Sequence, residues 1–272
     1  MAAKPVFALN HMCAPALPIP DFLDLAKSVG AIGVEIRNDL EGNAILDGTR
    51  PSQIASEAEA RGLTILSINA LQRFNDWNAA REEEARRLIA YAGECGAKAV
   101  VLVPTNDGTA VSRENLRVAL QGLRPLLENA GVTGLIEPLG FETCSLRLKS
   151  EAVEAIQALE AGNTFRLVHD TFHHFVAGEP GLFPSHTGLV HISGVTDPVV
   201  TVREMRDGHR VLVEEQDRLD NTGQITLLLR AGFEGAFSFE PFAEAVHRLT
   251  DPRPALERSI AFILQTIDRS GA

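Results

Sequence analysis

Cysteines are scarce in this sequence. The 272 residues include only three, Cys13, Cys95 and Cys144, an odd number with no CxxC spacing. This argues against a disulfide framework and against a zinc site built from thiolates. We therefore expect reduced thiols that are mostly packed inside the fold.

Clusters of basic residues and long apolar runs are lacking as well. The formal net charge is −11 and the basic residues are scattered, so the average surface repels phosphate backbones and anionic membranes. The N-terminal stretch MAAKPVFALNHMCAPALP is broken by prolines and is too short for a signal peptide or a membrane span. We expect a cytoplasmic protein that binds neither nucleic acid nor membranes. The sequence is compatible with a homo-oligomer.

No linker or low-complexity segment divides the chain, and short apolar runs alternate with amphipathic stretches. The runs typical of strands are VFALN (6–10), GVEIR (33–37), LTILSIN (63–69), AVVLVP (99–104), TGLIEP (133–138), FRLVHD (165–170), GLVHIS (188–193) and GAFSFEP (235–241). The stretches with a helical pattern include 51–61, 78–94, 113–130, 150–160 and 222–231. The glycines that fit a left-handed helix end are Gly30, Gly62, Gly96, Gly131, Gly162 and Gly232.

Strands that alternate with helices predict a parallel sheet. Eight such units in 272 residues predict a single (β/α)8 barrel domain over residues 1–272. An open doubly wound sheet is the alternative. That sheet is expected to carry a glycine-rich phosphate turn after its first strand, and LNHMCAPALP contains no GxGxxG pattern.

Ligand-type side chains stand at the ends of the last four predicted strands. In a (β/α)8 barrel these ends face the active site, and they carry Glu137, Asp170, His191 and Glu240. Taken singly, the glutamates could be buried acids paired with a basic residue, the aspartate a turn cap and the histidine a core residue. Together, three crowded carboxylates are costly without a neutralising cation, so we expect one divalent ion, Mn, Mg, Co or Zn.

The segment HDTFHHF, residues 169–175, surrounds one of these ligands. We expect His173 to reach the substrate or the metal site from the turn. His169 precedes Asp170 on the strand and should point to the opposite side, which is a structural position. The role of His174 is undecided: a position that supports the site from outside, or an exposed one, is favoured over a catalytic role.

At these residues the chain resembles the xylose-isomerase-like TIM barrels, a group that includes sugar epimerases, hydroxypyruvate isomerase, inosose dehydratase and endonuclease IV. The motifs most resemble the 2-keto-myo-inositol (inosose) isomerase branch: VEIR (34–37), SINALQRFN (67–75), LIEPLGFETC (135–144), HDTFHHF, VHIS (190–193), HRV (209–211) and SFEPF (238–242). The resemblance implies that Glu137, Asp170, His191 and Glu240 hold one metal and that His173 and Arg210 approach the substrate.

Three departures weaken the transfer of substrate identity. Ser193 and Gly194 stand where the family often has an acidic pair, VEEQDRLDN replaces a PGxG turn after Arg210, and Ala243 replaces an arginine that often follows the last glutamate. The four metal ligands that the resemblance implies are all present.

This set of residues suits proton transfer beside a carbonyl group. We expect an isomerase or epimerase of a keto-sugar or inosose, with Glu137 and Glu240 moving protons through an enediolate. Arg210, His173 and Arg37 would orient the substrate. Phe74 and Trp77 would cover the apolar face of a ring, or equally would pack in their loop.

Three other functions are weighed against this one. A dehydratase acting on an inosose or a dehydroshikimate could start from the same enolate. A barrel that binds sugar without catalysing a reaction is a further alternative. An endonuclease IV-like nuclease is disfavoured, because that enzyme has extra histidines at early strand ends, where this chain has Arg37, Asn69 and Pro104.

Overall fold

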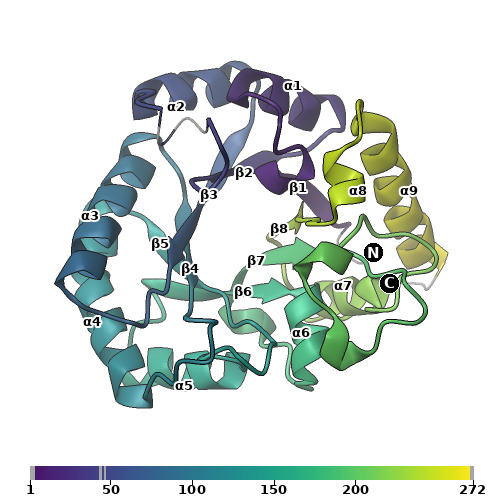
Figure 1. Cartoon of the computed structure of the whole chain (residues 1–272). Coiled ribbons are helices and arrows are strands. Elements are labelled where there is room, and N and C mark those ends of the chain that lie inside the picture. Colours follow the sequence, from purple (N-terminus) through teal and green to yellow (C-terminus); the bar gives the residue numbers. More distant parts are fainter. Residues whose placement is uncertain (1–3, 43–44, 46, 270–272) are drawn as a thin grey trace.

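Eight parallel strands close into a barrel in the computed structural model, which describes residues 4–42, 45 and 47–269 (Figure 1). The order around the barrel follows the chain, and the last strand pairs with the first. The strands are β1 (Val6–Asn10), β2 (Gly33–Arg37), β3 (Thr64–Gln72), β4 (Ala99–Val103), β5 (Thr133–Ile136), β6 (Phe165–Asp170), β7 (Thr187–Ile192) and β8 (Ala236–Phe239). The predicted (β/α)8 fold is confirmed.

Helices surround the barrel in an outer ring (Figure 1). They are α1 (Ile19–Ser28), α2 (Pro51–Ala60), α3 (Ala79–Glu94), α4 (Arg113–Ala130), α5 (Lys149–Ala158), α6 (Thr171–Ala177), α7 (Asn221–Arg230), α8 (Glu244–His247) and α9 (Arg253–Arg269). The five predicted helical stretches agree with α2, α3, α4, α5 and α7 to within two residues at each end. Within the described part of the chain, no helix combines the length and the apolar character that a membrane span needs. Residues 1–3 of the N-terminal stretch lie outside the described residues.

Positive φ angles confirm most of the predicted glycine helix ends. Gly30, Gly62, Gly96, Gly131 and Gly232 all have φ between 66° and 84°. The prediction is wrong for Gly162, because the chain turns two residues earlier, at Glu160, which has a φ of 47°. The three cysteines are free, and Cys13 and Cys95 are buried, as predicted.

Two apolar layers hold the barrel together and position the site. Alternate strand residues such as Val34, Ile136 and Val190 pack outward against the helices, where burial stabilises the fold by about 25 cal/mol per Å² of apolar surface. A second cluster is made of strand residues that point inward: Ala8, Ala70, Ala99, Val101, Leu135, Val168, Leu189 and Ala236. The interior layer therefore forms a packed floor below the strand ends.

Side-chain alternation carries the inward rows up to the barrel mouth. Because the period of a strand is two residues, the residues two positions beyond Leu135, Val168 and Leu189 also point inward. These are Glu137, Asp170 and His191, and by the same rule Glu240 follows Ser238. The strand pattern thus brings the four predicted ligands to one level, above an apolar floor.

Candidate active site

The four predicted ligands meet at the barrel mouth. One ligand atom from each of Glu137, Asp170, His191 and Glu240 lies within 4.8 Å of the corresponding atoms of the other three. All four side chains are buried, with at most 5% of any residue exposed. Among the described residues, this is the one group of three or more such side chains with the spacing of a metal site.

His191 lies at the centre of the group. Its Nδ1 is 2.9 Å from Glu137 Oε1, 3.2 Å from Glu240 Oε2 and 3.9 Å from Asp170 Oδ2. Its other nitrogen, Nε2, is 3.1 Å from Oε2 of Glu35, a residue of β2. Since ionised carboxylates only accept hydrogen bonds, this arrangement suits an imidazolium that donates from both nitrogens.

Two buried arginines contact the same carboxylates. Arg210 follows the short 3-10 turn Asp207–His209, and its Nη2 donates to Asp170 Oδ2 at 2.6 Å and to Glu240 Oε2 at 2.9 Å. Arg37, at the end of β2, donates from Nη1 to Glu240 Oε1 at 2.9 Å. Asn10 Nδ2 donates to that same oxygen at 3.1 Å. Glu240 is thus held from three sides.

The pKa values of the two glutamates move in opposite directions. Burial is the main influence on Glu137 and raises its pKa, which the nearby His191 offsets only in part. Burial acts in the same sense on Glu240, but His191, Arg210 and Arg37 outweigh it and lower the pKa of that carboxyl well below its usual range. Burial lowers the pKa of His191, yet the carboxylates around it raise the pKa well above its ordinary value.

The residues present fit a single divalent ion. The site holds four buried carboxylates, those of Glu35 and of the three acidic ligands, and two guanidinium groups, those of Arg37 and Arg210, which pair with Asp170 and Glu240. Each guanidinium also pairs with a carboxylate nearer the surface, so a cation would balance the excess negative charge. Metal–ligand bonds near 2 Å place two ligands up to about 4 Å apart, which small side-chain movements would satisfy here. Three oxygens and one imidazole nitrogen suit Mn, Mg, Co or Zn.

Zinc affinity should rise with pH. The carboxylates around His191 raise its pKa and so favour the protonated ring, and an ion that binds at Nδ1 must displace the proton from that nitrogen. We expect the association constant for zinc to increase by up to about tenfold per pH unit between pH 6 and 8, measured by competition with a chelator of known affinity. Affinity that is flat over this range would contradict a protonated His191. The raised pKa of His191 also makes the free energy of unfolding depend on pH when no ion is bound. The stabilisation that the protonated ring provides is fully present below the ordinary pKa of histidine and is lost as pH rises through the raised pKa in the folded protein.

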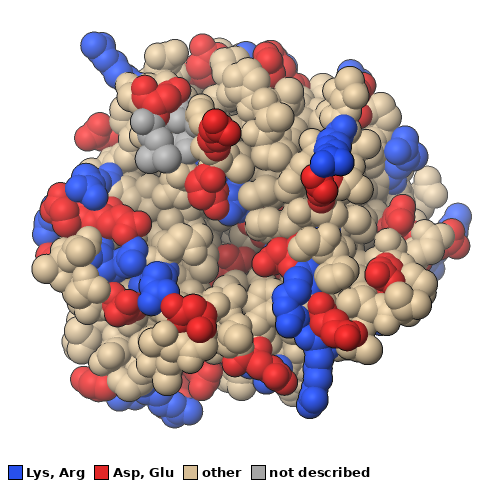
Figure 2. Space-filling view, viewed as in Figure 1, with Lys and Arg blue, Asp and Glu red and all other residues tan. Residues whose placement is uncertain are grey.

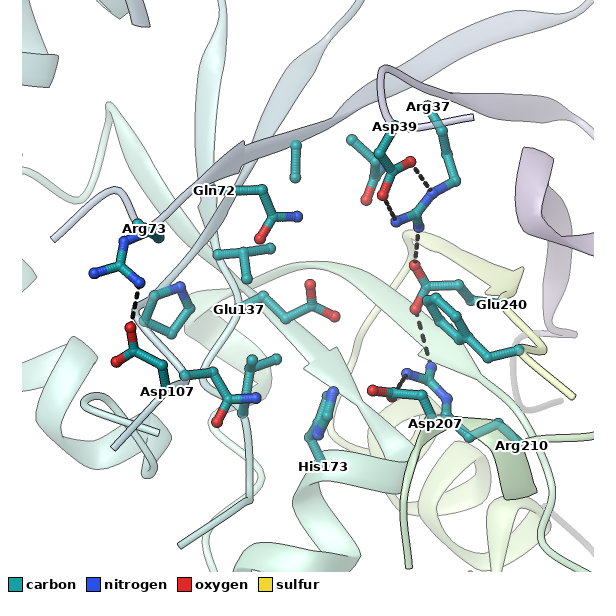
Figure 3. Close-up of a pocket in the computed structure, with 17 residues that line it drawn as sticks. Arg37, Asp39, Gln72, Arg73, Asp107, Glu137, His173, Asp207, Arg210 and Glu240 are labelled. Carbon is teal, nitrogen blue, oxygen red and sulfur yellow. Dashed lines mark hydrogen bonds and ion pairs between the residues drawn. The ribbon is translucent and has the colours of Figure 1, made fainter. Parts of the chain in front are cut away.

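A polar cavity of about 380 Å³ lies at the barrel mouth, next to Glu137 and Glu240 (Figure 3). Glu137 and Glu240 form part of its floor, and Arg37, His173 and Arg210 part of its wall. Figure 3 shows the two glutamate carboxylates pointing into this space toward one another. The hollow is open on the face seen in Figure 2, where acidic side chains are visible in its depth.

His173 reaches this cavity as the sequence predicts. Its backbone N–H donates to Asp170 Oδ1 at 2.9 Å, so Asp170 caps α6 as well as lying among the four ligands. The ring packs edge-on against Phe141, with ring centroids 5.0 Å apart. Its Nδ1 is buried and has no hydrogen-bond partner among the described residues. The residue as a whole lines the cavity, so its imidazole ring is within reach of a substrate bound there.

Phe74 and Trp77 do not reach the cavity, which corrects the expectation that they cover a substrate ring. Phe74 is fully buried in the layer between strands and helices. Trp77 is half-buried against the same layer, and it packs so closely on Gly122 of α4 that any added Cβ there would overlap its indole ring. The alternative of ordinary loop packing therefore describes both aromatics.

His169 and His174 lie behind the site. His169 points away from the barrel interior, as predicted, and its Nε2 lies 2.9 Å from Gln224 Oε1. Lys149 Nζ lies 2.9 Å from Nδ1 of His169 and 3.0 Å from Nδ1 of His174. Burial lowers the pKa of Lys149 to about 7. His169 and Lys149 are buried and His174 is half-buried, and none of the three lines the cavity.

Two acidic residues at the site, Asp39 and Glu35, were not predicted from the sequence. Asp39 binds Arg37 through two hydrogen bonds, of 2.8 and 2.7 Å, and so orients it toward Glu240. Glu35 contacts His191 from below the mouth. A signal for Glu35 was present, because a charged residue in the apolar run GVEIR lies two positions before Arg37 and must share its inward direction.

Ser193 and Ala243, two positions at which the sequence departs from the family pattern, both contact Arg210. Its hydroxyl accepts a hydrogen bond of 2.9 Å from Arg210 Nε, while the backbone carbonyl of Arg210 accepts from the N–H of Ala243 at 2.8 Å. These two departures from the family pattern therefore contact the arginine that joins Asp170 and Glu240.

Comparison with known proteins agrees with this architecture. A xylose isomerase domain containing protein from Salmonella typhimurium LT2 is 33% identical over 98% of both chains, with a TM-score of 0.89. IolI, solved with a bound zinc atom, is 20% identical over 97% of this chain and 98% of its own, with a TM-score of 0.83. A 3-keto-D-glucoside 4-epimerase from E. coli is 17% identical over 96% and 99%, with a TM-score of 0.70.

The two more distant structures support the fold alone.

Among curated protein sequences no match is found. The family model of the xylose isomerase-like TIM barrel matches residues 23–266. The chain therefore belongs to the xylose isomerase-like TIM barrel family.

Proposed function

We propose that the protein is a metal-dependent isomerase or epimerase of a keto-sugar or keto-cyclitol. The observation that carries the proposal is the pair Glu137 and Glu240, two buried carboxylates from β5 and β8 that approach one imidazole nitrogen, at 2.9 and 3.2 Å, on the floor of an open polar cavity. Such a pair suits removal of a proton from one carbon and its return at the neighbouring carbon.

The other residues bind and orient the substrate. Asp170 and His191 complete the metal ligands, and a bound divalent ion would polarise the substrate carbonyl and stabilise an enediolate. Arg37, Arg210 and His173 line the cavity, and side chains with N–H donors suit hydroxyl and carbonyl oxygens. The cavity volume of about 380 Å³ lies within the usual range for small-molecule sites.

Proteins of the same fold include enzymes that act on this substrate class. One of the structures described above is a 3-keto-D-glucoside 4-epimerase, and IolI was solved with a bound zinc atom. At their level of identity they show the fold, so the substrate class rests on the carboxylate pair and the polar cavity together.

Deuterium incorporation tests the proposal directly. Zinc- or manganese-loaded protein is incubated in deuterated water with a panel of inososes and ketohexoses, and products are analysed by mass and NMR. We expect one deuteron at the carbon next to the carbonyl, with the carbon skeleton and formula otherwise unchanged. Loss of water would indicate a dehydratase instead, and tight binding without exchange would indicate a barrel that binds sugar but lacks catalysis.

Nuclease activity is not expected. The part of the chain that the structure describes contains one candidate metal group, and the net charge of −11 disfavours duplex binding. Duplexes with an abasic site should remain intact after incubation with metal-loaded protein. Nicking accompanied by salt-sensitive binding would overturn this expectation.

A further inference from the structure

We propose that Glu35 is a positioning residue for the metal site, which fixes the tautomer and direction of His191 so that Nδ1 is presented to the ion. Glu35 is fully buried and does not line the cavity, so it would act through His191 and not on the substrate. The inference rests on the proposed metal ligands and is independent of which substrate the protein converts.

The contacts of His191 separate its two nitrogens. Nδ1 faces the carboxylates of Glu137 and Glu240, whereas Nε2 lies 3.1 Å from Glu35 Oε2. In a neutral imidazole one nitrogen keeps the proton and the other offers a lone pair. An ionised carboxylate at Nε2 favours the proton there, which leaves the lone pair of Nδ1 for a metal. A carboxylate behind a ligating histidine commonly fixes ring orientation and raises ligand basicity.

Glu35 is itself held in place by β3. The oxygen that faces His191 also accepts from Ser67 Oγ at 2.6 Å and from Asn69 Nδ2 at 2.9 Å. Strand register pairs Glu35 with Ser67, so the backbone of two neighbouring strands defines where this oxygen lies. Burial alone would raise the pKa of Glu35, but the contact with His191 outweighs it and keeps the pKa below its usual value.

A purely structural role would not require a charge at this position. Burying a carboxylate among interior residues costs free energy unless partners compensate for it. Ser67 and Asn69 could bond equally well to a neutral amide. His191 is the partner that requires a negative charge at Glu35. When an ion binds at Nδ1, the ring must keep its proton at Nε2, and an ionised carboxylate stabilises that proton.

Zinc affinity of Glu35 variants tests the proposal without any substrate. Glu35→Gln preserves the shape and one oxygen acceptor but removes the charge, and Glu35→Ala removes the acceptor. We expect the zinc dissociation constant to rise by about tenfold in Glu35→Gln and by about 100-fold in Glu35→Ala, the usual range for groups that support a ligating histidine. The constants are measured by chelator competition at fixed pH on the full chain.

Ser67→Ala is the matched control. It removes a buried hydrogen bond to the same Glu35 oxygen but no contact with His191, so it should lower the midpoint of urea unfolding while zinc affinity stays within about threefold. If Ser67→Ala and Glu35→Gln weaken zinc binding equally, the role of Glu35 is packing and the proposal fails. Should Glu35→Ala not fold, the comparison of Glu35→Gln with Ser67→Ala still decides.

Histidine NMR gives a second readout. In zinc-loaded protein labelled with ¹⁵N-histidine, assigned by comparison with His191→Gln, we expect the wild-type ring to be protonated at Nε2 and metal-bound at Nδ1. Glu35→Gln should show exchange between tautomers or a changed coordinating nitrogen. Unchanged affinity and an unchanged tautomer in this variant would overturn the proposal, as would a wild-type chain that does not bind zinc. Zinc binding without isomerase activity would contradict the proposed function and leave this inference standing.

Discussion

Glu137→Gln and Glu240→Gln should each keep a bound metal ion and lose at least about 10²-fold in turnover. An amide oxygen can still coordinate an ion, but glutamine cannot exchange a proton at neutral pH, and removing a general acid or base usually costs 10²-fold or more. Metal content after gel filtration and initial rates on the substrate identified by deuterium exchange provide the measurement. Near-normal exchange in both metal-loaded variants would show that the carboxylates do not transfer protons, and His173 would become the leading candidate.

Isotope exchange should also separate the two glutamates. If one of them removes the first proton from a given substrate, its glutamine variant stops deuterium uptake at that carbon. The other variant should still exchange that proton but fail to complete the isomerisation. Glu137 bonds to His191, whereas Glu240 bonds to Asn10, Arg37 and Arg210. The glutamine variant of Glu240 should therefore be the less stable of the two, because it disturbs more buried partners.

The period-two pattern of the strands explains why so much of the site could be predicted from sequence. Once eight strands are placed in a barrel, an acid or histidine at the end of each of the last four has one inward direction. The convergence of Glu137 and His191 follows from this without any knowledge of loops. The same rule applies to His169, which lies one residue before Asp170 and faces outward to Lys149.

The directions of loop side chains, and the carboxylates that the arginines contact, could not be predicted in the same way. Phe74 and Trp77 follow β3, and their directions depend on how that loop packs against α4, for which the sequence has no periodic signal. The two arginines were expected to face the substrate, but the structure also places them directly on Asp170 and Glu240. Side chains that long reach many partners, so position along the chain alone does not decide which carboxylate an arginine contacts.

Arg210→Met should have the largest effect on stability, and a bound ion should reduce that effect. The guanidinium is almost fully buried and joins Asp170 and Glu240. Removing one partner of a buried ion pair typically costs about 3–5 kcal/mol in the free energy of unfolding, because an uncompensated charge is left behind. We expect a loss of that size in metal-free protein, measured by urea unfolding at neutral pH.

The same measurement with zinc present distinguishes two roles for this arginine. If Arg210 and the metal ion balance the same carboxylates, zinc should restore part of the stability lost in Arg210→Met, and zinc should stabilise the variant more than the wild type. Arg210→Lys is the matched control: it retains the charge but loses the planar fork that contacts Ser193 and both carboxylates, so its loss should be intermediate. An equal loss with and without zinc would show that the two cations act on the carboxylates independently. Arg210 would then be a structural residue that joins the 3-10 turn before it to the ends of β6 and β8.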